Sequence, residues 1–230
     1  MIWTNSKYVG DGDVFLATSK NYKYIDLNLL KKVSKIVFVS DENKFIYDNY
    51  YDKIKDLKLI GITGTNGKTT TCYLIYQMLN LIGIKTAYIG TIGFYIDDMV
   101  FKLDNTTPEI SLLYNMLYYA KKRKCKVVVM EVSSHALKQD RIYGLLFDLV
   151  LVTNITRDHL DYHKTLKDYI KSKQKLIYQT RGKKICILNK KDKYYKKFKI
   201  KSNNNIIIGK DVKITLVLMN SSNTYVVVKD

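Results

Sequence analysis

The chain has 230 residues, of which 47% are hydrophobic and 26% are charged, a balance typical of a globular protein with one or two domains. It contains no run of roughly 18 apolar residues that would span a membrane, and its first residues lack the basic and apolar regions of a secretory signal. The three cysteines are scattered and form no CxxC pair, which argues against a disulfide framework and against a thiolate zinc site. We therefore expect a cytoplasmic protein.

The formal net charge is +18, which two explanations fit. A basic chain can carry a surface for nucleic acid or membranes, or its composition can have drifted toward Lys, Asn, Ile and Tyr. The lysines are spread over almost the whole length, and the chain has 20 tyrosines and a single proline, which favours drift. We expect no nucleic-acid partner, although the positive field would attract anionic substrates such as nucleotides.

The first part of the chain predicts a small α/β domain. Residues 13–17 and 36–39 have the composition of strands, and residues 27–33 between them have helical spacing. Residues 47–56 are polar and rich in tyrosine, which indicates a connector or a short helix. We place a domain boundary after this stretch, so that residues 1–57 form the N-terminal domain.

From residue 58 onward, strands alternate with helices. Apolar runs predict strands at residues 59–63, 86–89, 127–130, 147–152, 185–188 and 206–208. Helical spacing covers residues 68–82, 109–124 and 164–179, and a hairpin is expected within residues 92–101. This order predicts an α/β fold with a mostly parallel sheet covered by helices on both faces. The last stretch, residues 212–229, alternates as short antiparallel strands.

A candidate phosphate loop lies between the first of these strands and its helix: Gly64-Thr65-Asn66-Gly67-Lys68-Thr69-Thr70. Glycines let backbone N–H groups turn toward phosphate oxygens, and the following helix adds the partial positive charge of its N-terminus. Lys68 can reach the β- and γ-phosphates, and the Thr69 hydroxyl can bind Mg²⁺. The usual pattern has a glycine where this chain has Ile62, so the loop is a variant; the alternative is an ordinary strand-to-helix turn.

Acidic and histidine side chains follow two other predicted strands. Glu131 ends the strand at 127–130 and can hold Mg²⁺ at the carboxyl edge of the sheet, although a lone glutamate there is more often a solvated strand end. All three histidines, His135, His159 and His163, lie within or beside such strand ends. The spacing of four between His159 and His163 permits a zinc site with Asp158 or Asp161, but neither an HExxH context nor thiolates accompany it. A magnesium-linked or orienting histidine fits a nucleotide site better.

Three motifs, in this order, resemble the Mur ligases: the loop at 64–70, Met130-Glu131-Val132-Ser133-Ser134-His135, and Thr153-Asn154-Ile155-Thr156-Arg157-Asp158-His159-Leu160-Asp161. Three further stretches resemble the MurE type in particular, which extends UDP-MurNAc-L-Ala-D-Glu by a diamino acid: Asn105-Thr106-Thr107-Pro108, residues 136–141, and Asp161-Tyr162-His163 followed by Tyr169 and Lys173. The resemblance covers about residues 59–188. It is weaker at Asn5-Ser6-Lys7 and at residues 12–17, which resemble a uridine-binding N-terminal domain.

The resemblance implies a set of roles. Residues 64–70 would hold the ATP phosphates, with Thr69 on one Mg²⁺ and Glu131 and His159 on a second. Lys173 falls where the family has a lysine carbamylated by CO₂ that binds the metal or orients phosphate; by itself it would be one more solvated lysine, like Lys171 and Lys175. The catalytic residues would be Lys68, His159 and Lys173. The UDP-muramoyl-dipeptide would be held by Ser6, Asn105, Thr106, Thr107, Ser133, Gln139 and Arg141.

The implied activity is ATP-dependent amide formation in peptidoglycan precursor synthesis, and so in cell-wall biogenesis, cell shape and division. The substrate carboxylate would attack the γ-phosphate to give an acyl phosphate, which the amine of meso-diaminopimelate or L-lysine then attacks. We expect a monomer with a partial uridine-nucleotide-binding domain at 1–57 and a truncated central ATP-binding domain at 58–230. The family's C-terminal domain, with its Asp-Asn-Pro-Arg-type motif, is missing, so we expect a fragment. Two alternatives remain open: another ligase of the superfamily, such as a folylpolyglutamate synthase, and an inactive nucleotide-binding remnant.

Overall fold

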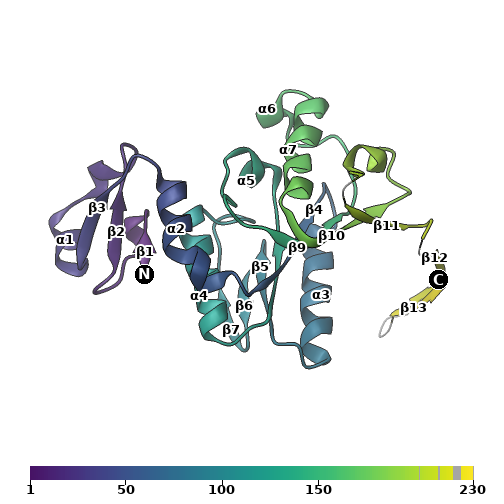
Figure 1. Cartoon of the computed structure of the whole chain (residues 1–230), viewed down its shortest axis with the longest axis horizontal. Coiled ribbons are helices and arrows are strands. Elements are labelled where there is room, and N and C mark those ends of the chain that lie inside the picture. Colours follow the sequence, from purple (N-terminus) through teal and green to yellow (C-terminus); the bar gives the residue numbers. More distant parts are fainter. Residues whose placement is uncertain (202, 212, 220–223, 230) are drawn as a thin grey trace.

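The computed structural model describes residues 1–201, 203–211, 213–219 and 224–229. Three sheets follow one another along the molecule (Figure 1): a three-stranded sheet near the N-terminus, an eight-stranded sheet in the middle and a two-stranded hairpin at the other end. Helices lie against the central sheet. The predicted α/β architecture with a mostly parallel sheet is confirmed.

The N-terminal sheet is parallel and consists of β1 (Ile2–Trp3), β2 (Val14–Ala17) and β3 (Lys35–Phe38). The helix α1 (Leu27–Lys32) connects β2 to β3, as expected from the sequence. Asp26 caps this helix by accepting a hydrogen bond from the backbone N–H of Leu29 at 2.7 Å. Strand β1 was not predicted, because two residues are too short to show an alternating pattern.

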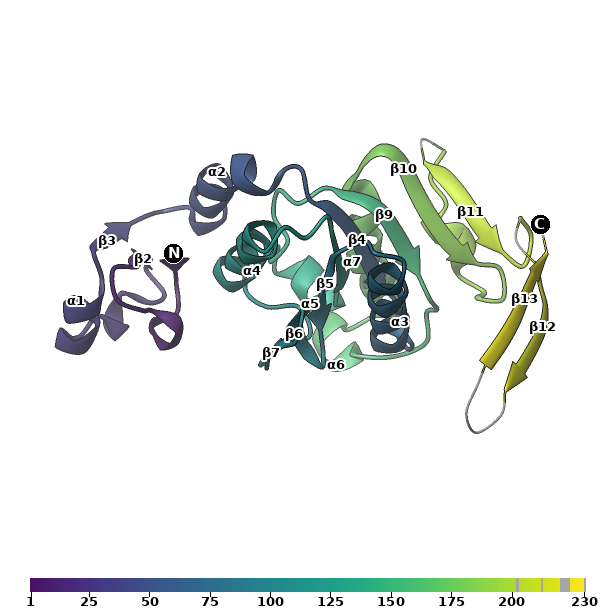
Figure 2. The same cartoon turned by 90° about the horizontal axis from the view of Figure 1, so that it is seen from below.

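Residues 42–54 form the helix α2 (Glu42–Ile54), so the helical alternative for residues 47–56 holds, but the helix starts five residues earlier and is longer than expected. Asp41 caps its N-terminus by accepting a hydrogen bond from the N–H of Lys44 at 2.9 Å. The buried positions Ile46, Tyr50 and Ile54 are four residues apart and face α4 (Ile110–Lys122). The polar tyrosines and charges between them concealed this spacing. Figure 2 shows α2 running beside α4, between the N-terminal sheet and the central sheet.

The central sheet has the strand order β11-β10-β9-β4-β8-β5-β6-β7. Its strands from β11 to β5 are parallel, and the hairpin of β6 and β7 adds an antiparallel edge. The strands are β4 (Lys58–Thr63), β5 (Thr86–Gly90), β6 (Gly93–Ile96), β7 (Met99–Phe101), β8 (Val127–Glu131), β9 (Phe147–Val152), β10 (Thr180–Asn189) and β11 (Asn204–Ile208). Besides α4, the helices are α3 (Lys68–Leu81), α5 (Ser134–Lys138), α6 (Leu160–His163) and α7 (Leu166–Tyr178).

Three features of this sheet region departed from expectation. Strand β10 begins five residues before the predicted start at 185, because its first part is charged and shows no apolar run. Its register against β9 shifts between Thr180 and Ile185. The helices α5 and α6 were not predicted. They are only five and four residues long, and a helix of about one turn leaves no periodic pattern in the sequence.

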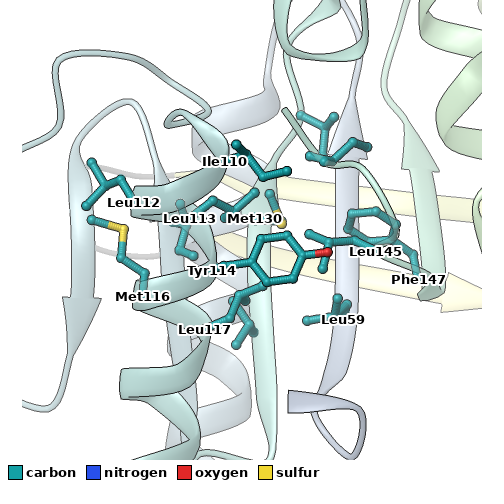
Figure 3. Close-up of a cluster of buried hydrophobic side chains, with 14 of the residues drawn as sticks. Leu59, Ile110, Leu112, Leu113, Tyr114, Met116, Leu117, Met130, Leu145 and Phe147 are labelled. Carbon is teal, nitrogen blue, oxygen red and sulfur yellow. The ribbon is translucent and has the colours of Figure 1, made fainter. Parts of the chain in front are cut away.

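The two faces of the sheet carry separate cores. Successive side chains of a strand point to opposite faces, so Val128 and Met130 of β8 pack with α4 and α7, while Val129 packs with α3. Figure 3 shows the larger core, where α4 lays its apolar side over β4 and β8. Leu113 and Leu117 are completely buried there, and burying a leucine side chain contributes about 1.5–3 kcal/mol relative to exposure.

The chain continues into the antiparallel pair β12 (Lys213–Met219) and β13 (Thr224–Lys229), which confirms the short antiparallel strands expected in this part of the sequence. Residue 212, where that prediction began, lies outside the described residues. No helix within the described ranges is long and apolar enough to cross a membrane.

Candidate functional site

The three sequence motifs meet at the carboxyl edge of the central sheet. Strand β4 lies between β8 and β9, and all three run parallel, so the residues that follow them lie at one edge. β4 leads into the loop at 64–67, β8 ends at Glu131, and β9 leads into Thr153. In parallel α/β sheets this is the edge where ligands bind. The expectation that these motifs come together is confirmed.

The loop after β4 has the geometry of a phosphate cradle. Gly67 is the N-cap of α3 and has φ of 80°, a left-handed backbone conformation that residues other than glycine rarely adopt. The helix begins at Lys68, so Thr69 and Thr70 lie in its first turn, where the backbone N–H groups have no acceptor within the helix. An anion at this helix end would meet those N–H groups and the positive end of the helix dipole.

Hydrogen bonds to the segment after β9 hold this loop in shape. Thr65 N–H donates to the Asn154 carbonyl at 2.7 Å, and Asn66 N–H donates to Asn154 Oδ1 at 3.1 Å. The Thr153 hydroxyl donates to the Asn66 carbonyl at 2.7 Å, and the Thr65 hydroxyl lies 3.0 Å from Tyr169 Oη. Thr65 and Asn66 therefore shape the loop, and the N–H groups from Gly67 onward are placed to meet phosphate.

Lys68 folds over the loop. Its Nζ donates to the carbonyls of Gly64 at 3.1 Å and Thr65 at 2.9 Å. Partial burial lowers the pKa of Lys68, and the nearby Glu131 carboxylate acts in the opposite direction. The ammonium thus lies at the mouth of the loop, where a phosphate group would replace the two carbonyl contacts with stronger charge-assisted ones.

Glu131 is completely buried and accepts four hydrogen bonds. Its Oε1 accepts from Tyr88 Oη at 2.6 Å and from Thr91 N–H at 2.9 Å. Its Oε2 accepts from the hydroxyls of Thr69 at 2.9 Å and Thr91 at 3.2 Å. The alternative of a solvated strand end is therefore wrong. A buried carboxylate oxygen next to the Thr69 hydroxyl is a donor set that suits Mg²⁺, which is often held by one or two protein oxygens together with phosphates and water.

Lys173 is buried, with 1% of its surface exposed, so the alternative of a solvated lysine is also wrong. Its Nζ donates to the Gly64 carbonyl at 2.8 Å and lies 4.6 Å from the centre of the Tyr169 ring. Burial, together with the nearby Lys68 cation, lowers the pKa of Lys173 to about 7. Near neutral pH a large share of this amine is therefore uncharged, and the uncharged form is the nucleophile that reacts with CO₂. Lys171 and Lys175, on the same helix, are exposed.

The histidines gather at the same edge, with His135 between the other two. Its ring centre lies 4.9 Å from that of His159 and 5.7 Å from that of His163. His163 is buried against Tyr169, and this burial lowers its pKa, whereas His159 is about half exposed and lies beside Asp158. His159 is the N-cap of α6, with φ of 49°, so His159 and His163 are not a zinc pair on one helix face. No cluster of three or more His, Cys, Asp or Glu side chains that could hold a metal ion occurs among the described residues.

The predicted substrate residues form a wall joined directly to Glu131. The Thr107 hydroxyl donates to the Glu131 carbonyl at 2.9 Å and accepts from Ser133 N–H at 3.0 Å. Arg141 Nη1 donates to the Thr107 carbonyl at 2.8 Å, and Arg141 Nε donates to Gln139 Oε1 at 2.8 Å. This network links Arg141 to the backbone of Glu131 through a single threonine.

Thr106 and Ser133 complete this wall. The Thr106 hydroxyl lies 3.1 Å from that of Thr91, which also contacts Glu131. The Ser133 hydroxyl caps α5 by accepting from Ala136 N–H at 3.1 Å, so part of its hydrogen-bonding capacity serves the helix. Five of the seven predicted substrate residues therefore lie close together.

The other two, Ser6 and Asn105, lie at the seam with the N-terminal sheet. Ser6 is exposed in a short 3₁₀ turn (Ser6–Tyr8). In this turn Lys7 Nζ contacts Asp104 Oδ2 at 3.0 Å, and Tyr8 Oη contacts the same oxygen at 3.2 Å. Asn105 lines a small cavity of about 60 Å³ next to this turn. These residues extend the substrate wall toward the N-terminal sheet.

The sequence did not reveal a large cavity of about 820 Å³ beside the phosphate loop. Asn66, Gly67 and Asn154 line it on one side, and Asn189 and Gly209 close it on the other. Asn189 and Gly209 follow the strands predicted at 185–188 and 206–208, so the rule that ligands bind at the carboxyl edge could have identified them. Tyr88 and Thr91, the partners of Glu131, carry no motif and were also missed.

Comparison with known proteins supports the interpretation of this edge. Residues 62–220 match the Mur ligase middle domain. UDP-N-acetylmuramoyl-L-alanyl-D-glutamate--2,6-diaminopimelate ligase 1 of Clostridium acetobutylicum is 40% identical over 213 residues, which cover 88% of this chain and 43% of that protein. A solved structure of a UDP-N-acetylmuramoyl-L-alanyl-D-glutamate--2,6-diaminopimelate ligase has a TM-score of 0.77 at 21% identity. The match covers 99% of this chain and 53% of the chain in that structure.

A MurF ligase from Thermotoga maritima in complex with ADP shares the fold, with a TM-score of 0.68 at 18% identity, and covers 99% of this chain and 55% of its own. The chain spans less than half the length of the curated relatives that it matches. The matched domain covers well over half of the chain and contains the phosphate loop, Glu131 and Lys173. The chain therefore belongs to the Mur ligase family.

Proposed function

We propose that the chain is the N-terminal and central part of a MurE-type ligase that uses ATP to join 2,6-diaminopimelate to UDP-MurNAc-L-Ala-D-Glu in the cytoplasm. The observation that carries this proposal is the connected network from Thr69 and Glu131 to Thr107 and Arg141, which would put a phosphate site and an anion-binding wall side by side. The relative at 40% identity has this activity in its name, which favours it over a folylpolyglutamate synthase and favours diaminopimelate over lysine.

ATP would bind across the edge of the sheet. Its phosphates would meet the N-terminus of α3 and the Lys68 ammonium, which can leave the loop carbonyls for the β- and γ-phosphates. Its nucleoside would enter the cavity of about 820 Å³, where the side chains of Asn66 and Asn189 offer amide groups for hydrogen bonding. The ADP complex of the Thermotoga maritima MurF ligase supports a nucleotide on this fold.

Thr69 and Glu131 would hold one Mg²⁺, and Glu131, His159 and Lys173 would hold a second. When bound, the metal would offset the negative charge that builds up where the substrate carboxylate approaches the γ-phosphate. Lys173 would serve as a carbamate, because its buried amine has a pKa of about 7 and so reacts readily with CO₂. A carbamate would give this position the oxygen ligands that Mg²⁺ prefers.

The muramoyl-dipeptide would lie along the wall of Asn105, Thr106, Thr107, Ser133, Gln139 and Arg141, with its uridine toward Ser6. Arg141 is held in a fixed orientation by Thr107 and Gln139, so its remaining N–H groups can bind a carboxylate without a search through rotamers. Because Thr107 also contacts Glu131, the wall would bring the reacting carboxylate to the γ-phosphate. Positioning of two anions in one orientation supplies much of the rate enhancement in such reactions.

Calorimetry with two ligands tests this function. The non-hydrolysable ATP analogue AMPPCP with Mg²⁺, and UDP-MurNAc-L-Ala-D-Glu, should each bind the chain. Arg141→Ala should weaken the second ligand roughly tenfold to a hundredfold, the worth of one charged hydrogen-bonding partner, and leave AMPPCP binding intact. The exposed Arg157→Ala is the matched control. AMPPCP binding without any binding of the muramoyl-dipeptide would favour a nucleotide-binding remnant, and the absence of both would refute the proposal.

A further inference from the structure

A tyrosine outside every sequence motif reaches the carboxylate of Glu131. Tyr88 lies on β5, next to β8, where it pairs with Val129, two residues before Glu131. Both side chains belong to the α3 face of the sheet, and Tyr88 Oη donates to Glu131 Oε1 at 2.6 Å. The Glu131 carboxylate therefore has a donor from the neighbouring strand in addition to those from its own site.

Gly90 makes room for this contact. It lies two residues after Tyr88 on β5, on the same side of the strand. A Cβ atom at this position would collide with both Glu131 Oε1 and Tyr88 Oη. The two polar groups meet directly above the glycine, so the pair depends on a third residue that has no side chain.

The Tyr88 ring is fixed by its surroundings. It is completely buried, with edge-on contacts to Tyr73 at 5.8 Å and Tyr95 at 5.6 Å between ring centres. Tyr76 lies 6.2 Å away. Such packing allows one orientation of the ring. Burial and the adjacent carboxylate raise the pKa of Tyr88 far above its ordinary value, so the phenol remains a hydrogen-bond donor.

The two oxygens of Glu131 therefore differ. Oε1 is held by Tyr88 Oη and the backbone N–H of Thr91, and neither donor can turn away. Oε2 is held by the hydroxyls of Thr69 and Thr91, which can rotate toward other partners. We propose that Tyr88 is a positioning residue: it fixes Oε1 of Glu131 so that Oε2 alone is presented to the divalent cation of the nucleotide site.

This arrangement suits Mg²⁺ in particular. The ion demands near-ideal octahedral geometry, and a carboxylate that offers a single, oriented oxygen meets that demand better than one free to rotate or to chelate with both oxygens. Partners that orient a ligand from behind commonly contribute a factor of 10–100 to metal affinity. The inference rests on the proposed function, since it takes Glu131 to be a metal ligand.

The test compares AMPPCP affinity by calorimetry in Mg²⁺ and in EDTA; the ratio of the two affinities is the metal-dependent gain. Tyr88→Phe removes the hydroxyl and keeps the ring, and we expect it to reduce this gain about 10–100-fold while the affinity in EDTA stays the same. Tyr95→Phe, in the same ring cluster, is the matched control and should keep the gain. Thr91→Val removes the rotatable hydroxyl but keeps the backbone N–H, and should have an effect below that of Tyr88→Phe.

The outcomes distinguish the positioning role of Tyr88 from the proposed metal site at Glu131. If Glu131→Gln abolishes the gain while Tyr88→Phe leaves it within twofold of the wild type, the positioning role of Tyr88 is refuted and the metal site stands. If Glu131→Gln also keeps the gain, the proposed metal site itself is refuted. Thermal melting in EDTA shows whether Tyr88→Phe is folded, and the titration is run below its melting temperature, so a less stable variant still gives a decisive result.

Discussion

The two edges of the central sheet both carry charged side chains, but they use them differently. At the amino edge, Arg181 Nη2 pairs with Asp148 at 3.1 Å, and Lys58 pairs with the same aspartate at 3.1 Å. Arg181 also donates to the carbonyls of Lys55 and Leu57, which ties the linker after α2 to the sheet. Burial would raise the pKa of Asp148, yet its hydrogen bonds from Arg181, Leu59 N–H and Lys58 outweigh this and lower it. Asp148 therefore pairs with both Arg181 and Lys58 within the protein.

At the carboxyl edge the charges are not neutralised in this way. Lys68 and Lys173 donate to backbone carbonyls, and neither forms an ion pair with any of the residues that the structure describes. Glu131 is held by neutral donors. Burying Glu131 and partly burying Lys68 without a direct ion pair costs stability, in contrast to the paired Asp148. The contrast fits a stabilising role for the amino edge and, at the carboxyl edge, the binding of the charged ligand proposed above.

The largest expected effect is a loss of nucleotide affinity at the carboxyl edge. Lys68→Ala should lower the affinity for Mg-AMPPCP about a hundredfold, because it removes a charge-assisted contact to phosphate worth up to about 3 kcal/mol. Lys171→Ala, an exposed lysine of α7, should change the affinity less than twofold. Calorimetry of both variants checks this, and equal losses would show that binding depends on the overall positive charge of the chain.

A smaller effect is expected at the amino edge. Arg181→Ala should lower the free energy of unfolding by about 2 kcal/mol, since it leaves the partly buried Asp148 and two carbonyls without their donor. Urea denaturation measures this change. The affinity for Mg-AMPPCP of the folded variant should match the wild type, and a parallel loss of affinity would mean that the two edges are not independent.

Lys173 should give the carboxyl edge a pH dependence of stability. Its pKa is about 7 in the folded protein and about 10.4 in an unfolded chain. Between these values the unfolded chain binds more protons, so the free energy of unfolding should rise with pH by up to about 1.4 kcal/mol per pH unit. Urea denaturation from pH 7 to 9.5 in CO₂-free buffer, wild type against Lys173→Met, isolates this slope. Parallel curves for the two proteins would contradict it.

The smallest effect separates the two partners of Asp148. The Lys58 side chain is 64% exposed, whereas that of Arg181 is 24% exposed. Lys58→Ala should therefore lower the free energy of unfolding by only about 0–1 kcal/mol, the usual worth of an exposed ion pair. Urea denaturation of this variant beside Arg181→Ala tests the claim that burial and the carbonyl contacts, and not the charge alone, make the amino edge strong.

The positions of the strands and longer helices were predictable from the sequence because their signals are local. The continuous apolar runs of β8 and β9 and the spacing of α3 and α4 depend on residues at most four positions apart. The length of α2 was misjudged because tyrosines and charged residues separate its buried positions, and α5 and α6 were missed because a helix of one turn shows no periodic pattern. The phosphate loop was visible since its glycine, lysine and threonine are consecutive.

The surroundings of the site residues were a different matter. Lys171, Lys173 and Lys175 look alike along the chain, yet Lys173 alone of the three is buried, because α7 packs that side against α5 and β4. Glu131 takes its donors from Thr69 at the start of α3 and from Tyr88 and Thr91 in and just after β5, which are far from it in the sequence. Most backbone segments and the candidate phosphate loop could be recognised along the chain, since both depend on short-range geometry. The burial of Lys173 and the hydrogen bonds of each Glu131 oxygen could not, since they depend on the side chains that distant segments place around a charge.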